Sequence, residues 1–283
     1  MHTVCHGCMR WLYAMAWLLG AACFAMASDM PFRVGVAPHT SARLILQQYQ
    51  PLRASLEKGL GQPVEIATAP DFTDFARRAL RGEYDLAITT GHQALLLRDD
   101  AHYLPLVTYR APFQAVVVGL ASMPAGSSAA QLNGKTVLGL SPSSLVTLWG
   151  IHWLEQNKVK PQRMQFISAA DSMAQLVIQH DAVVGFMSQA NYEKLSAETR
   201  AQLRVVARSP EMAGRIYLLH PRLASRQAQL MRLIQQFGQS AEGMQYFQEN
   251  KLDGYRLLKP GELEVMRPYA DEVRRTLATQ PGH

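Results

Sequence analysis

The chain has 283 residues, of which 48% are hydrophobic and 18% are charged, with a formal net charge of +6. This is an ordinary globular composition with enough apolar material for a sizeable core, in one large or two moderate domains. The basic residues are dispersed and form no concentrated patch with aromatic side chains. Because nucleic-acid binding normally needs such a patch, we do not expect a nucleic-acid-binding protein despite the positive net charge.

The first 27 residues have the layout of a secretory signal peptide. Arg10 precedes an apolar segment, residues 11–24, and Ala25 and Ala27 form a small-residue cleavage site. The apolar segment is short for a membrane span, and no later stretch reaches about 18 apolar residues. We therefore expect cleavage after Ala27 and a mature protein of the periplasm; an uncleaved anchor is the alternative.

All three cysteines, Cys5, Cys8 and Cys23, lie inside this signal. The mature chain is therefore expected to have neither a disulfide bond nor a catalytic thiol. Cys23 ends the sequence LLGAAC, an imperfect lipoprotein signal, so lipidation at Cys23 is the alternative to cleavage after Ala27. In that case a lipid anchor would attach the protein to the membrane.

The mature sequence alternates short apolar strands with amphipathic helices, the pattern of α/β proteins with parallel sheets. The first series of predicted elements is strand 32–38, helix 41–58, strand 63–68, helix 71–81, strand 84–90, a helix around 93–98, and strands 103–110 and 113–120. After the turn-rich segment 121–135, the second series is strand 136–140, helix 144–157, strand 164–167, helix 172–179, strand 182–187, helix 190–195 and strand 203–209. A return strand at 214–221 and helices at 226–239, 241–250 and 261–279 follow.

The closing strand and helices have no sheet of their own, which favours two lobes with two chain crossings between them. We expect a signal peptide at 1–27, one lobe formed by 28–117 plus 211–283, and the other by 118–210. Each lobe would be a mostly parallel sheet flanked by helices. A cleft between the lobes and a hinge at the crossings would then allow closure on a ligand.

Four strand-to-helix junctions, at 36–43, 88–94, 140–147 and 186–192, are rich in hydroxyl side chains. Loops after the carboxyl ends of parallel strands converge on the ligand crevice. Each helix starts there with unpaired N–H groups that attract anions. Simple helix capping also explains any one junction. The candidate ligand-binding residues are His39, Thr40, Thr89, Thr90, His92, Ser141, Ser143, Ser144 and Ser188.

His39 and His92 occupy equivalent positions after two strands of the first lobe, where each either donates a hydrogen bond to an oxyanion or is a structural polar residue. No third histidine or acidic residue has matching spacing, so we expect no metal and no cofactor. The sequence also lacks a phosphate-binding loop and the G-x-S-x-G and H-E-x-x-H motifs. We expect no enzymatic activity; a hydrolase using Ser143 or Ser144 with His92 is the least favoured alternative.

Four segments, 32–66, 81–97, 132–157 and 254–275, resemble the periplasmic substrate-binding proteins of phosphate, phosphite and phosphonate ABC transporters. The resemblance implies a type II periplasmic binding protein fold. It also implies that Ser141, Ser143 and Ser144 hold the oxyanion while loops of the first lobe close over the other side. Members that bind aminophosphonates use acidic residues for the amine, and Asp181 is the one candidate here near a strand of the second lobe.

The leading hypothesis is therefore a monomeric secreted protein that closes around a small anion and delivers it to an ABC permease. The alternative is a sensory module that presents its ligand-bound state to a receptor kinase. In both cases the protein would reach the membrane only through its partner or through a lipid on Cys23.

Overall fold

The computed structural model describes residues 30–124 and 129–279. The predicted signal peptide, with Cys5, Cys8 and Cys23, lies outside the described residues. Among the described residues, no helix is long and apolar enough to cross a membrane.

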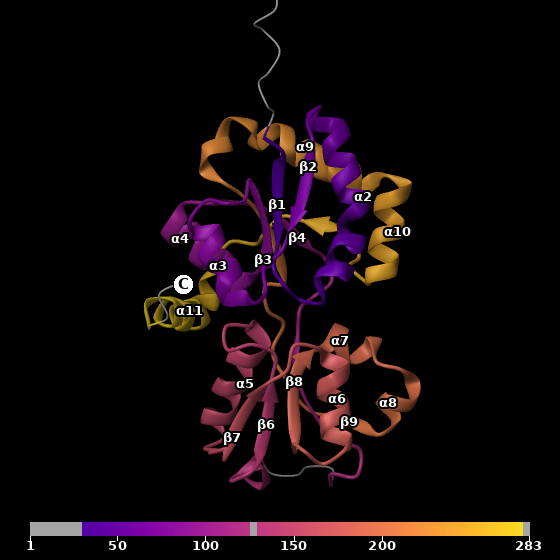
Figure 1. The fold of residues 1–283 in the computed structure, drawn as a ribbon, viewed down its shortest axis with the longest axis vertical. Helices are drawn as coiled ribbons and strands as arrows, with labels where there is room; N and C mark the ends of the chain where they lie inside the picture. Colours follow the sequence, from indigo (N-terminus) through magenta and orange to yellow (C-terminus); the bar gives the residue numbers. More distant parts are fainter. Residues whose placement is uncertain (1–29, 125–128, 280–283) are drawn as a thin grey trace, which may run out of the picture. The chain divides into compact units, whose positions relative to one another are not determined.

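Segments from both ends of the described chain build a six-stranded sheet (Figure 1). In spatial order its strands are β11 (Tyr255–Arg256), β4 (Leu104–Tyr109), β10 (Arg215–Leu219), β3 (Leu86–Thr90), β1 (Phe32–Val36) and β2 (Val64–Ala67). β1 pairs in parallel with β2 and β3, whereas β10 runs antiparallel to β3 and β4. The return strand predicted at 214–221 is thus confirmed as β10, in the interior of this sheet.

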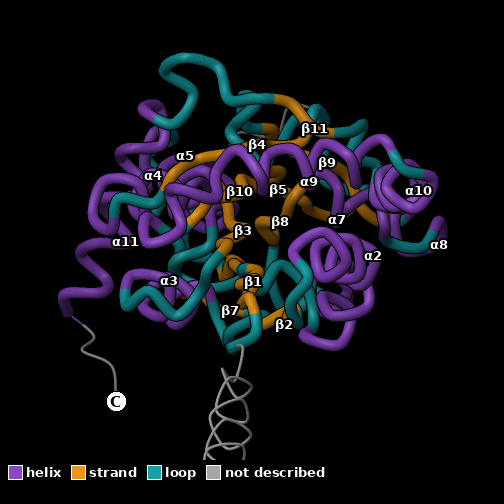
Figure 2. The backbone as a smooth tube through the Cα atoms, turned by 90° about the horizontal axis from the view of Figure 1, so that it is seen from above, coloured by secondary structure: helices purple, strands orange, loops and turns teal. Residues whose placement is uncertain are grey.

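Helices cover both faces of the first sheet, and Figure 2 shows the two groups on opposite sides of it. One group is α2 (Ala42–Leu60), α9 (Gln227–Gln239) and α10 (Ala241–Asn250); the other is α3 (Phe72–Leu80), α4 (Gly91–Ala101) and α11 (Arg267–Thr279). Short 3₁₀ turns precede α9 and α11, at Pro221–Arg226 and Glu264–Met266.

The starts of two of these helices follow from local sequence. The side chain of Ser41 accepts a hydrogen bond from the Leu44 N–H and so caps α2. Asp71 accepts hydrogen bonds from the N–H groups of Thr73 and Asp74 and so caps α3.

A second, five-stranded sheet is formed by the middle of the chain. Its strands in spatial order are β7 (Arg163–Phe166), β6 (Thr136–Gly139), β8 (Val184–Ser188), β5 (Ala115–Leu120) and β9 (Leu203–Arg208). The helices that follow these strands are α5 (Leu145–Gln156), α6 (Ala170–Ile178), α7 (Gln189–Lys194) and α8 (Ala197–Ala201), and a 3₁₀ turn, Ala129–Leu132, precedes β6.

The sequence pattern assigned one strand, β5, to the wrong sheet. Segment 113–120 was expected to continue the first sheet, but β5 pairs antiparallel with β8 and β9 in the second. Both sheets are consequently mixed rather than mostly parallel, because a strand next to each chain crossing, β5 or β10, runs against its neighbours. An apolar run reveals a buried strand but carries no information about its pairing partners.

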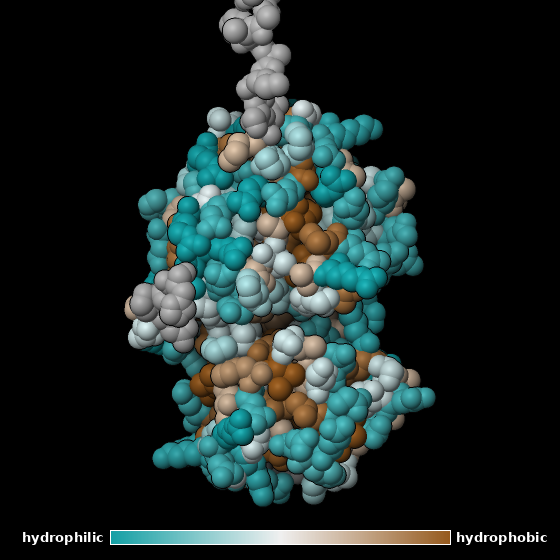
Figure 3. Space-filling model, viewed as in Figure 1, coloured by the Kyte–Doolittle hydropathy of each residue, from teal (hydrophilic) through white to brown (hydrophobic). Residues whose placement is uncertain are grey.

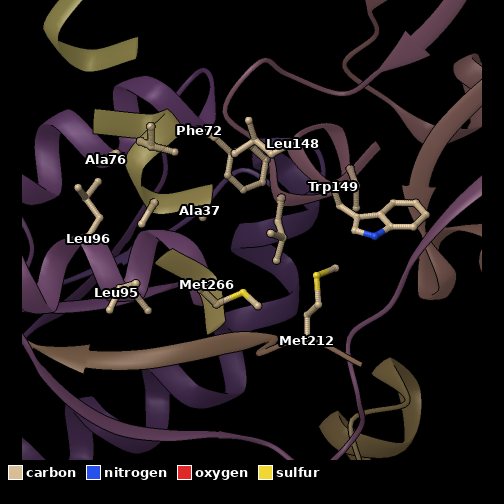
Figure 4. Close-up of a cluster of buried hydrophobic side chains, with 14 of the residues drawn as sticks. Ala37, Phe72, Ala76, Leu95, Leu96, Leu148, Trp149, Met212 and Met266 are labelled. Atoms are coloured by element: carbon tan, nitrogen blue, oxygen red, sulfur yellow. The ribbon is translucent and has the colours of Figure 1, made fainter. Parts of the chain in front are cut away.

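We call the first sheet and its helices lobe 1 (residues 32–112 and 213–279) and the second sheet and its helices lobe 2 (115–209). The two chain crossings meet at an antiparallel bridge between Phe113 and Met212. One hydrophobic cluster includes residues of both lobes, among them Phe72 and Leu95 from lobe 1 and Trp149 from lobe 2 (Figure 4). The lobes are therefore in apolar contact along α3, α4 and α5.

Candidate functional site

A cleft of about 760 Å³ is lined by residues of both lobes. Lobe 1 contributes segments 38–44 and 70–72, which follow β1 and β2. Lobe 2 contributes 140–141 after β6, 166–175 after β7, and 191–199 around α7 and α8. The cleft therefore lies at the carboxyl ends of the parallel strands, where α/β proteins bind ligands.

Three of the predicted ligand-binding residues, His39, Thr40 and Ser141, line this cleft. The hydroxyl oxygen of Ser141 is shielded from solvent and has no hydrogen-bond partner among the described residues. A shielded hydroxyl without a partner costs free energy. A ligand atom in the cleft that pairs with Ser141 would recover that cost.

Ser143 lies at the junction of the two lobes rather than on the cleft wall. It is 1% exposed, and its Oγ is 2.7 Å from Thr73 Oγ1 in lobe 1. Its carbonyl oxygen is 2.9 Å from Nε2 of His92, also in lobe 1. Both polar groups of Ser143 thus hold lobe 2 against lobe 1.

His92 is fully buried, and its two ring nitrogens have different roles. Nε2 donates to the Ser143 carbonyl, which leaves Nδ1 to accept from Thr90 Oγ1 at 3.1 Å. Burial lowers the pKa of His92 to about 4, although the bond to Ser143 opposes the shift. His92 is therefore a neutral bridge between the lobes near pH 7.

The other predicted hydroxyls have partners within their own helices or junctions. Ser144 and Ser188 are the N-caps of α5 and α7, with their Oγ atoms accepting from the N–H groups of Thr147 and Asn191. Thr89 Oγ1 donates to Gln93 Oε1 at 2.7 Å. At these three positions the hydroxyl groups therefore cap helices or hold the local structure, as the alternative to anion binding predicts.

His39 reaches the cleft but has no free N–H. Its Nδ1 donates to the Ala37 carbonyl at 3.0 Å, so Nε2 is the acceptor for Nη1 of Arg215 at 3.1 Å. Burial, followed by the charge of Arg215, lowers the pKa of His39 to about 3. The cationic donor at this point is therefore Arg215, with neutral His39 against it.

Arg215 is the first residue of β10, and its guanidinium group lies among aromatic side chains. Its Nη1 is 3.2 Å from Tyr49 Oη, and its guanidinium carbon lies 5.4 Å from the centre of the Tyr109 ring. Tyr109 in turn shares hydroxyl contacts with Tyr217 and Tyr246 at 2.7 and 2.6 Å. Among the described residues no carboxylate forms an ion pair with Arg215.

A second cation, Lys194, approaches from lobe 2. It is the last residue of α7 and lines the cleft. Partial burial, then the charges of Arg215 and Lys251, lower the pKa of Lys194. Lys194 and Arg215, one from each lobe, therefore repel each other.

The cleft also contains a helix start with no side-chain cap. The N-cap of α6 is Ala169, which cannot accept a hydrogen bond, and residues 168–171 line the cleft. Two carboxylates, Asp71 and Asp171, lie on the exposed rim, and Asp71 is engaged in capping α3. Asp181 instead lies in an exposed turn before β8, at the opposite end of that strand from Ser188, so it is not the cleft acid suggested by the sequence.

Comparison with known proteins identifies the family. The model of the periplasmic substrate-binding protein of ABC phosphonate transporters matches residues 34–262. The chain belongs to this family. Phosphonate-binding family members are periplasmic, bind a small ligand, work with an ABC transporter permease, and are substrate-binding proteins rather than enzymes.

Solved structures of similar fold include PhnD1 from Prochlorococcus marinus in complex with methylphosphonate, with a TM-score of 0.74 and 15% identity over 87% of this chain and 98% of that one. A binding protein component of an ABC phosphonate transporter from Pseudomonas aeruginosa has a TM-score of 0.72 and 18% identity, covering 90% of each chain. XAC2383 from Xanthomonas citri, solved with chloride and with ATP, has a TM-score of 0.73 and 17% identity, covering 87% of this chain and 99% of that one in the chloride form. These likenesses show the type II periplasmic binding protein fold. No curated protein matches the chain.

The geometry gives no support to the hydrolase alternative for this phosphonate-binding family member. Ser143 and Ser144 direct their hydroxyls to Thr73 and Thr147, and His92 faces a carbonyl oxygen rather than a serine hydroxyl. A nucleophile needs a base within hydrogen-bond reach. Within the described residues there is also no group of three His, Cys, Asp or Glu side chains that could hold a metal ion.

Sequence reasoning missed two cations, Lys194, which lines the cleft, and Arg215, which contacts the cleft residue His39. Arg215 opens an apolar strand 176 residues after His39, and nothing in its sequence neighbourhood indicates a contact with that histidine. Lys194 ends a short helix, a position where a lysine commonly serves the helix dipole. One prediction could have pointed to Arg215. If the strand at 214–221 returns to the first sheet, its first residues lie beside the strand-to-helix junctions of lobe 1, as Arg215 does beside Thr90.

Proposed function

We propose that the protein captures a small oxyanion, phosphonate-like or phosphate-like, in the interlobe cleft and delivers it to an ABC permease. One observation carries the proposal: Arg215 and Lys194 come from opposite lobes, and neither has an acidic partner among the described residues. An anion between them would neutralise both charges and remove their mutual repulsion. Closure of the cleft would then be favourable only with an anion inside.

Magnitudes support a site built from several donors. Micromolar affinity corresponds to about 8 kcal/mol, whereas one hydrogen bond to a charged group contributes about 1.5–3 kcal/mol. Arg215 and Lys194 supply two charged donors, and the uncapped start of α6 and the Ser141 hydroxyl add neutral ones. Together, donors from both lobes reach the required range.

Within this proposal the predicted residues divide into two groups. His39, Thr40 and Ser141 contact the ligand, since they line the cleft. The others hold the helix starts and the lobe junction in place: Thr89, Thr90, His92, Ser143, Ser144 and Ser188. Export with cleavage after Ala27 would deliver this monomeric receptor to the periplasm, where the family supports a permease as its partner.

Isothermal titration calorimetry of the purified protein tests the proposal against methylphosphonate, phosphate, phosphite, sulfate and acetate. Arg215→Gln and Lys194→Gln should each weaken the binding of the preferred oxyanion about 10- to 100-fold, which corresponds to one charged hydrogen bond. Lys135→Gln is the matched control, because Lys135 is exposed in lobe 2 and does not line the cleft. A folded protein that binds none of these anions, or cation variants that bind like the control, would refute the proposal.

A further inference from the structure

His39 lies between Arg215 and the interlobe cleft. His39 lines the cleft, whereas Arg215 is not among the lining residues. Figure 3 shows the surface hollowed between the two lobes, where this cleft lies. The Nε2 atom of His39 accepts a hydrogen bond from Nη1 of Arg215 at 3.1 Å. The imidazole therefore occupies the position from which a ligand in the cleft would reach the guanidinium group.

The surroundings of Arg215 fix its guanidinium group in place. Nη1 also donates to Tyr49 Oη at 3.2 Å, and the guanidinium carbon lies 5.4 Å from the centre of the Tyr109 ring. Tyr49 and Tyr109 are buried side chains of α2 and β4. His39, by contrast, belongs to the loop between β1 and α2, and loops move more readily than the elements that they connect. If this contact opens, we expect His39 to be the partner that moves.

An anionic oxygen is a stronger acceptor for Arg215 than the neutral imidazole is. His39 is neutral near pH 7, because burial and then the charge of Arg215 lower its pKa to about 3. Its hydrogen bond with the guanidinium group is therefore charged on the donor side only. An oxyanion adds a Coulombic attraction that the neutral ring lacks. Exchange of the imidazole for an anionic oxygen is therefore favourable for Arg215.

Gln48 of α2 offers His39 a replacement hydrogen-bond donor. Its Oε1 is 3.3 Å from His39 Nε2, while its own Nε2 is shielded from solvent and has no hydrogen-bond partner among the described residues. A shielded N–H group without a partner costs free energy. Half a turn of the carboxamide would bring this N–H group to the imidazole nitrogen once the bond from Arg215 is lost. Both the ring and the carboxamide would then have a partner.

We infer that His39 is a gate on Arg215: before an anion binds, the imidazole covers the guanidinium group, and an oxyanion reaches Arg215 by replacing His39 as its acceptor. The inference rests on the proposed function and deepens it, because it specifies how an anion in the cleft reaches a cation that does not line it. Lys194 lines the cleft itself, so the anion meets it first. A neutral ligand gains no Coulombic attraction and leaves His39 in place, which makes His39 a specificity-determining residue for charge.

A double-mutant cycle on anion affinity tests the gate. Calorimetry would measure the binding of methylphosphonate, phosphate and sulfate to the wild-type protein, His39→Ala, Arg215→Gln and the double variant. His39→Ala should tighten anion binding about 2- to 10-fold, the net value of one hydrogen bond that no longer has to be broken. In the Arg215→Gln background the same replacement should give no gain, because the gated cation is absent.

Gln48→Leu provides a second readout. It should weaken anion binding by a similar factor in the wild-type background, because the displaced ring loses its partner, and should have no effect in the His39→Ala background. His102→Asn is the control for loss of an imidazole, since His102 is exposed, does not line the cleft and has a φ of 56° that asparagine tolerates. Thermal unfolding of each variant checks that the fold is intact.

The outcomes separate the gate from the proposed function. A gain from His39→Ala that persists in the Arg215→Gln background would overturn the gate, because it would show only that a smaller side chain enlarges the cleft. Anion binding by the wild-type protein that His39→Ala leaves unchanged or weakens would also overturn it, while the proposed function would stand. If none of the three anions binds to the wild-type protein or to His39→Ala, the proposed function fails and the gate fails with it.

Discussion

Replacing His92 by glutamine should make the stability of the protein less sensitive to acid. His92 is fully buried between the lobes, and burial lowers its pKa from 6.5 to about 4. Between these values the unfolded chain carries a proton on this histidine and the native protein does not. Stability contributed by neutral His92 is therefore present above about pH 6.5 and is lost as the pH falls towards about 4.

The size of the effect follows from the shift. The difference of about 2.5 pKa units between 6.5 and about 4, at 1.36 kcal/mol per unit, amounts to about 3 kcal/mol. The slope is one proton, or about 1.4 kcal/mol of unfolding free energy per pH unit. His92→Gln keeps an N–H donor but cannot titrate, so its stability curve should be flatter by this amount.

Urea denaturation at a series of pH values from 4 to 7 measures the slope directly. The comparison uses slopes, because the variant also changes the hydrogen bond to Ser143 and hence the stability at every pH. His180→Asn is the control, since His180 is exposed with a positive φ of 64° that asparagine tolerates. Parallel curves for the wild type and His92→Gln would refute the argument, as would equal flattening in the control.

Three further changes test the packing within and between the two lobes. A double-mutant cycle of Thr73→Ala and Ser143→Ala should give a coupling free energy of about 1 kcal/mol in urea unfolding, because their hydroxyl oxygens lie 2.7 Å apart across the lobe junction; additive effects would contradict this contact. Gly150→Ala should lower the melting temperature by several degrees, corresponding to about 1–3 kcal/mol of overpacking, since the new Cβ would lie 2.5 Å from the ring of Phe186; an unchanged melting temperature would show that the ring moves freely. Tyr217→Phe should cost about 1–2 kcal/mol in the same urea assay, because its hydroxyl contacts two other tyrosine hydroxyls, at 2.7 and 3.0 Å; no loss would mean that the network adds no stability.

Local chemistry explains why the helices of the cleft could be predicted. Ser41 and Asp71 can cap a helix whatever surrounds them, and both do so in the structure. The apolar spacing of Leu44, Tyr49, Leu52 and Leu56 indicates one face of α2; the last three are buried, whereas Leu44 is exposed. These signals depend on neighbours within one or two turns of the chain, so the sequence alone contains them.

Pairing between strands depends on distant segments, and there the sequence was less informative. Segment 113–120 looks like any buried strand, and only its partners β8 and β9 assign it to lobe 2. The same limit explains why Arg215 was missed. Its contact with His39 joins residues 176 positions apart and depends on β10 lying beside β3.

Ser143 shows how a correct local pattern can have more than one structural use. The polar junction between β6 and α5 predicted an anion-holding helix start, and Ser141 does line the cleft. Two residues later, however, Ser143 is bound to Thr73 and His92 of lobe 1. Thr73 follows Phe72 in α3, and Phe72 belongs to the apolar cluster that includes Trp149 of α5 (Figure 4). If the cleft opens while these contacts persist, α3 and α5 stay together, and we expect the cleft-lining starts of α2 and α7 to move apart instead.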